Sequence, residues 1–192
     1  MPLRRVVEEG TVTAGADTDL RSLLSEELAT ATGHVDLELA TSPLVEISSS
    51  VDYLLQYPYG CAEQTSSSLM PWLAVKNLRP YVPAFAKKSD KEVSDAIQAG
   101  IARLLSMQRP NGSFGYWPGA EETNEWVTPY AGLVLTLASQ NGGNVPPSAL
   151  ETLSQYLIES LRGAGEAKSS AIFENHARSL YTLALLGKAQ PP

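Results

Sequence analysis

The sequence contains a single cysteine, Cys61, and this excludes any intrachain disulfide framework. The two histidines do not have metal-ligand spacing with that cysteine, so no metal site is predicted. No stretch approaches the roughly 20 consecutive apolar residues of a membrane span. The N-terminus also lacks the apolar core of a signal peptide. We therefore expect no metal, no cofactor and no direct membrane contact by this chain.

Charged residues are also scarce. They make up 18% of the 192 residues, against about 25% in a typical globular protein. The net charge of −7 argues against a general binder of nucleic acid or of anionic membranes. The apolar share of 43% is ordinary. A chain of this length forms one good-sized domain or part of a larger one.

The most informative feature that is present is the spacing of Cys61 and Gln64, in the run Tyr57-Pro58-Tyr59-Gly60-Cys61-Ala62-Glu63-Gln64-Thr65. If the chain turns tightly here, the sulfur reaches the side-chain amide carbon of the glutamine. Attack at that carbon expels ammonia and leaves an internal thioester. Gly60 tolerates backbone angles closed to other residues. The competing interpretation is that a lone cysteine is simply a small buried hydrophobe.

The residues around this pair suggest how the bond would be supported. Thr65 and the serines after it can cap a helix that starts at or just after the motif. The aromatic rings of Tyr57, Tyr59 and Trp72 exclude water and would shield a water-labile bond. Glu63 is a candidate general base, or a residue that orients the thioester.

This run resembles the thioester signature of the α2-macroglobulin and complement superfamily. Alanine inside the motif, with Tyr-Pro ahead of it, is similar to the bacterial α2-macroglobulins. The resemblance covers roughly residues 45 to 190 and includes three further segments: Leu69 to Trp72, Gln108 to Gly115, and Glu125 to Tyr130.

The resemblance implies a single-use covalent trap, an endopeptidase inhibitor rather than a turnover enzyme. In that family a protease cleaves a bait region elsewhere in the protein, and the thioester is uncovered. The acyl group of Gln64 is then transferred to the target. The implied partners are target proteases and the remaining domains of the same full-length protein, without nucleic acid. The implied location is the periplasm or the cell envelope.

His176 is a second candidate for chemistry. Some relatives in the superfamily carry a histidine at about this distance, which takes the acyl group as an acyl-imidazole and frees the thiolate as a base. The alternative is an ordinary histidine on a helix surface. Residues 116–126 combine aromatic and acidic side chains, a pattern found in sugar sites, but such rings more often pack a loop against helices.

The pattern of apolar and polar residues divides the chain into two parts. Residues 1–47 read as a β-rich segment from a neighbouring domain, with alternation at 35–39. Residues 48–192 read as helices over 62–78, 129–141, 149–163 and 171–186, together with a helix whose apolar face runs from Val93 to Leu105. Capping boxes are predicted at Ser89 with Glu92 and at Ser148 with Glu151, and Thr128 is predicted as an N-cap. The expected fold is mainly α: helical hairpins of an α/α toroid, incomplete in this chain.

Two further functions remain open at this point. One is a cysteine-nucleophile acyl-transfer enzyme that uses Cys61 with His176, and repeated turnover would identify it. The other is a structural helical repeat with an inactive motif, which would not react with methylamine at all.

Overall fold

The computed structural model describes residues 10–13, 15–17, 19, 39, 53–55, 60–163 and 169–188. The chain divides into two compact units, Met1–Leu39 and Ala40–Pro192. The described residues of the first unit form no strand. Most of the predicted β-rich segment at 1–47, including His34, lies outside the described residues, as do Tyr57 and Tyr59.

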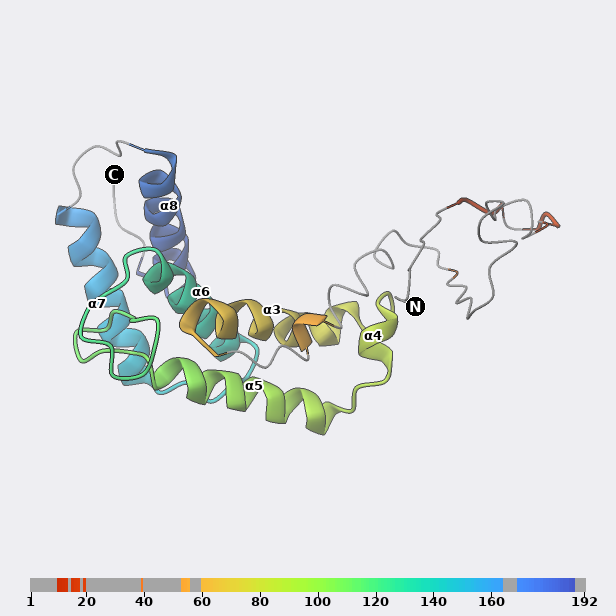
Figure 1. The fold of residues 1–192 in the computed structure, drawn as a ribbon, viewed down its shortest axis with the longest axis horizontal. Helices are drawn as coiled ribbons and strands as arrows, with labels where there is room; N and C mark the ends of the chain where they lie inside the picture. Colours follow the sequence, from red (N-terminus) through yellow and green to blue (C-terminus); the bar gives the residue numbers. More distant parts are fainter. Residues whose placement is uncertain are drawn as a thin grey trace, which may run out of the picture. The chain divides into compact units, whose positions relative to one another are not determined.

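The second unit is built from helices (Figure 1), which confirms the prediction of a mainly α fold. The described helices are α3 (Ala62–Leu78), α4 (Pro83–Ala86), α5 (Asp90–Leu105), α6 (Val127–Gln140), α7 (Pro147–Gly163) and α8 (Ser170–Leu185). The five long helices match the five predicted ones to within a few residues. The short α4 was not predicted, because a helix of 4 residues is too brief to show apolar periodicity.

Of the helix caps predicted for α5, α6 and α7, two are wrong. The Ser89–Glu92 capping box at the start of α5 is confirmed. Helix α6, however, begins before Thr128, and the side chain of Asn124 accepts from the amides of Trp126 and Val127. Helix α7 begins at Pro147. Glu151 forms an ion pair with Lys188 at 2.7 Å instead of a cap, and this hydrogen bond and charge lower the pKa of the Glu151 carboxyl.

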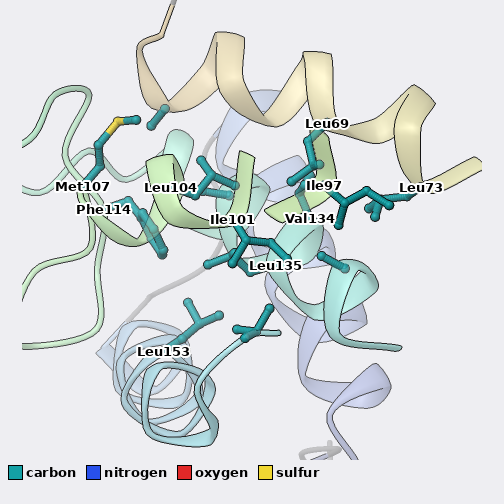
Figure 2. Close-up of a cluster of buried hydrophobic side chains, with 14 of the residues drawn as sticks. Leu69, Leu73, Ile97, Ile101, Leu104, Met107, Phe114, Val134, Leu135 and Leu153 are labelled. Atoms are coloured by element: carbon teal, nitrogen blue, oxygen red, sulfur yellow. The ribbon is translucent and has the colours of Figure 1, made fainter. Parts of the chain in front are cut away.

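Helix α6 is central to the packing, because it contacts α3, α5, α7 and α8. Helix α3 also packs on α5, and α7 on α8. Leucine, isoleucine and valine side chains from four helices fill the space between them (Figure 2): Leu69 and Leu73 from α3, Ile97, Ile101 and Leu104 from α5, Val134 and Leu135 from α6, and Leu153 from α7. The start of α3 is thereby held on a packed core.

The loop between α5 and α6 packs against α7 and is hydrogen-bonded to it. Gln108 donates a hydrogen bond to the carbonyl of Ala149 at 2.9 Å. Gly112 has a φ of +88°, and a Cβ built there would lie 2.1 Å from the carbonyl oxygen of Thr152. Phe114 is fully buried in the core. This loop then continues to Tyr116, which touches the start of α3.

Helix α8 presents apolar side chains to solvent. Ile172, Phe173, Leu180 and Tyr181 are between 41% and 66% exposed. None of the described helices has both the length and the apolar character needed to span a membrane.

Candidate functional site

Cys61 is the N-cap of α3, and Gln64 is the third residue of that helix. The Cys61 sulfur accepts a hydrogen bond from the Gln64 amide at 3.5 Å. In return, the Cys61 amide donates to Oε1 of the Gln64 side chain at 3.4 Å. The two side chains are thus folded back over the same turn, in a capping box in which cysteine takes the usual place of serine or threonine.

The N-cap of α3 is not formed by Thr65 or the serines after it, which the sequence predicted for this role. The side chain of Ser66 donates to the carbonyl of Ala62 at 2.7 Å, and that of Ser68 donates to the carbonyl of Thr65. Both are bonds within the helix rather than caps. Serine, threonine, aspartate and asparagine are the favoured N-cap residues, so a cysteine here needs a reason other than helix stability.

The pair lies at the edge of the core. Cys61 is 8% exposed and Ala62 is fully buried, while Gln64 is half-buried. The sulfur therefore has little contact with water, as a stored acyl bond requires. Burial fits a hydrophobic cysteine equally well, and the reciprocal hydrogen bonds add that the Cys61 and Gln64 side chains share one helical turn.

Two long-range contacts hold the backbone on either side of Cys61. The guanidinium of Arg103, in the last turn of α5, donates to the carbonyl of Gly60 from Nε at 3.0 Å and from Nη2 at 2.8 Å. The amide of Ala62 donates to the carbonyl of Tyr116 at 2.9 Å. The backbone of the motif is therefore fixed by α5 and by the loop after it.

Gly60 has a different role from the one predicted. It is absent from the described glycines with positive φ, so the turn does not need its conformational freedom. A Cβ at this position would lie 3.1 Å from Nε of Arg103. The missing side chain instead lets the guanidinium approach the backbone closely.

Glu63 is connected to α6 and α8. Its carboxylate accepts from Ser67 Oγ at 2.9 Å, and Ser67 Oγ lies 3.1 Å from the hydroxyl of Tyr130. The guanidinium of Arg178 lies over the rings of Tyr130 and Trp126, at 5.3 and 5.7 Å. These contacts connect Glu63 to α6, and none of them involves Cys61 or Gln64.

His176 lies on α8, two residues before Arg178, and is half-buried. No hydrogen bond among the described residues joins it to Cys61 or Gln64. Nearby, Asn175 Oδ1 and Arg178 Nη1 are buried without a hydrogen-bond partner in the described part of the chain. Such atoms are normally satisfied by water or by a further polar group.

Trp72 does not lie beside the pair. It follows Cys61 by eleven residues along a helix, which corresponds to about 16 Å at 1.5 Å per residue. Its ring instead lies under the ammonium of Lys88, at 5.8 Å. The predicted shielding by Trp72 is therefore not supported. The roles of Tyr57 and Tyr59 stay predictions, because both lie outside the described residues.

Arg103, Tyr116 and Tyr130 were not predicted from the sequence. Arg103 follows its partner Gly60 by 43 residues, and no spacing rule relates positions so far apart. The structure also shows no group of three or more His, Cys, Asp and Glu residues placed to hold a metal ion, among the residues it describes.

Comparison with known proteins gives consistent matches. Residues 34–180 match the family model described as A-macroglobulin TED domain. The alpha-2-macroglobulin of Escherichia coli is 33% identical over 129 residues, which are 67% of this chain and 8% of that protein. That of Xylella fastidiosa is 30% identical over an alignment 203 residues long, which covers 98% of this chain and 12% of that protein.

Solved structures agree with these matches. A crystal structure of native E. coli alpha-2-macroglobulin, from domain MG7 to the C-terminus, has a TM-score of 0.65 at 29% identity; the match covers 79% of this chain and 25% of that one. Salmonella alpha-2-macroglobulin reacted with methylamine has a TM-score of 0.65 at 30% identity, over 79% of this chain and 10% of that one. The chain thus spans about a tenth of the length of its curated relatives.

Proposed function

The chain belongs to the A-macroglobulin TED, or thioester-domain, family, and from this premise we propose that it stores an internal thioester between Cys61 and Gln64 for the covalent capture of proteases. The observation that carries the proposal is the reciprocal capping box, in which the cysteine sulfur and the glutamine amide share one helical turn. The relatives' names, alpha-2-macroglobulin, support a place in a protease-inhibitor family.

The chemistry has two steps. In the first, the Cys61 sulfur attacks the side-chain carbon of Gln64, and the carbon–nitrogen bond breaks. Ammonia leaves with the thiol proton, and a thioester remains. In the second, an amine on the target attacks the thioester carbonyl and the carbon–sulfur bond breaks. The sulfur takes up the proton that the amine loses, and the target is left amide-linked to residue 64.

The local structure supports both steps. The helix N-terminus favours negative charge, and the Gln64 amide already donates to the sulfur, so a departing thiolate is stabilised where it forms. The Salmonella relative was crystallised after reaction with methylamine, a small amine of the kind that attacks a thioester. Because the acyl group is consumed in the reaction, each chain reacts once.

Methylamine labelling tests the proposal. We expect one methylamine to be incorporated per chain, together with the release of one titratable thiol. Repeated turnover of an acyl substrate would favour the cysteine-nucleophile enzyme. A chain that takes up no methylamine and exposes no thiol would favour the inactive helical repeat, and either result would contradict the proposal.

The proposal extends to the whole protein. The partners are target proteases and the other domains of a bacterial α2-macroglobulin, and the location is the periplasm or the cell envelope. The family membership and the relatives' names support a place among the other domains of a large protein, and the proteases and the location are what the resemblance implies.

We also propose that His176 relays the acyl group to hydroxyl targets. Amines attack a thioester directly, whereas hydroxyls need a base such as the freed thiolate. His176→Ala is therefore expected to lose glycerol incorporation and to keep methylamine incorporation, measured by mass spectrometry of the labelled chain. His34→Ala is the control and should change neither. Equal loss or equal retention of both labels in His176→Ala would remove the relay role.

A further inference from the structure

The peptide unit between Gly60 and Cys61 is hydrogen-bonded at both ends. Its carbonyl accepts two hydrogen bonds from the Arg103 guanidinium, at 3.0 and 2.8 Å. Its N–H donates to Oε1 of Gln64 at 3.4 Å. The Arg103 guanidinium, this peptide group and the side-chain carbonyl of Gln64 are therefore joined by a continuous series of hydrogen bonds.

That carbonyl oxygen is the atom on which charge develops during the reaction. When the sulfur attacks the Gln64 side-chain carbon, the electron pair of the carbonyl moves to this oxygen. The same happens when an amine attacks the thioester carbonyl. In each case the charge is lost again as the leaving group, ammonia or the Cys61 thiolate, departs.

We propose that the backbone N–H of Cys61 is the oxyanion donor of the thioester site, and that Arg103 is a positioning residue that orients and polarises this donor. The proposal rests on the function proposed above. It adds a residue outside the motif to the groups that act when the thioester forms and when an amine attacks it.

Preorganisation is the physical basis of this role. A fixed donor aimed at a developing oxyanion stabilises the transition state more than the ground state. Hydrogen bonds that share a peptide group strengthen one another, so the cation on the Gly60 carbonyl makes the Cys61 N–H a better donor. The distance of 3.4 Å exceeds the usual 2.7–3.2 Å for a neutral pair. Charge on the oxygen shortens such bonds, so this contact tightens as the oxyanion forms.

The geometry suits arginine in particular. Two nitrogens of one planar guanidinium converge on a single oxygen, and a lysine ammonium provides only a point charge there. Gly60 leaves room for this approach, since a Cβ would lie 3.1 Å from Nε. Arg103 itself is exposed, so its removal leaves the core in place and separates reaction rate from folding.

The test is the rate of methylamine attack on the thioester-bearing chain. We expect Arg103→Met to slow it about tenfold, on the scale of a hydrogen bond to a charged group. Arg103→Lys should recover part of the loss, because it restores the charge. Gly60→Ala should also slow the reaction, by displacing the guanidinium without removing it. In Arg103→Met the infrared band of a ¹³C-labelled thioester carbonyl should move to higher frequency, because its hydrogen bond is weaker.

Arg79→Met is the matched control. Arg79 joins the opposite ends of the same two helices, through Asp90 at 2.8 Å, but does not touch the motif. It should leave the methylamine rate and the carbonyl band unchanged. If it slows the reaction as much as Arg103→Met, the link between α3 and α5 is what matters and the polarisation proposal is overturned.

The other outcomes are equally distinct. A wild-type rate and an unshifted band in Arg103→Met would overturn the inference and leave the proposed function standing. A wild-type chain without a thioester would overturn both. If Arg103→Met does not fold, Gly60→Ala and Arg103→Lys decide the matter, and wild-type rates in both would overturn the inference.

Discussion

Cys61→Ser is expected to lose all methylamine incorporation and to keep the helical fold. The substitution removes the only thiol, while a serine hydroxyl can still accept the hydrogen bond from the Gln64 amide. Serine is among the preferred N-cap residues, so the free energy of unfolding should change by less than about 1 kcal/mol. The measurements are mass spectrometry after methylamine treatment and thermal unfolding.

Gln64→Glu is the matched variant on the acyl side. It keeps an oxygen acceptor for the Cys61 amide and therefore keeps the capping box. It has no ammonia to release, so it is expected to form no thioester and to take up no methylamine. Loss of cooperative unfolding in Cys61→Ser would show that the motif is structural. Methylamine uptake by either variant would show that the acyl group lies elsewhere.

Gly112→Ala is expected to have the largest effect on stability. The residue has a φ of +88°, and the new Cβ would lie 2.1 Å from the Thr152 carbonyl oxygen. The left-handed conformation costs roughly 1–2 kcal/mol for an L-residue, and overpacking adds roughly 1–3 kcal/mol. We expect the free energy of unfolding to fall by about 3 kcal/mol in total, measured by urea denaturation.

Gly142→Ala separates the two contributions. Its φ of +84° is similar, but nothing lies within 4 Å of the position that a Cβ would take there. We therefore expect a loss of only about 1 kcal/mol. Equal losses at the two positions would mean that the loop does not pack against α7 as described. Since the same loop provides Tyr116 to the motif, Gly112→Ala should also shorten the lifetime of the thioester.

The helices could be predicted from the sequence because their signals are local. Apolar side chains at helical spacing define α5, and its capping box joins residues three apart. The bounds of α3 also agree with the prediction, although Pro71 lies inside this helix. Local rules suffice where neighbouring residues supply the hydrogen bonds.

The start of α6 shows where local rules fail. Thr128 fits an N-cap by residue type, but its hydroxyl donates to the carbonyl of Asn124 and accepts from the amide of Phe114. This arrangement depends on a loop that folds back across the helix start. The loop's position is set by its own packing against α7, so no pattern within the helix reveals it.

The residues of the candidate site also fall into two groups, those with a local sequence signal and those brought in by tertiary packing. Cys61 and Gln64 could be proposed from the sequence because the chemistry of an internal thioester fixes their spacing. The same spacing also matches a capping box with cysteine in the place of serine, and this local signal could have identified the true cap. Arg103, Tyr116 and Tyr130 approach the motif only through tertiary packing, and their contacts could not be read from one sequence.

The intact mass of the native chain tests the central claim most directly. A Cys61–Gln64 thioester makes the chain lighter than its sequence mass by one ammonia, and it leaves no thiol that titrates without denaturant. We predict both results, with the ammonia deficit lost after methylamine treatment. A native chain with the full sequence mass and one freely titrating thiol would contradict the thioester.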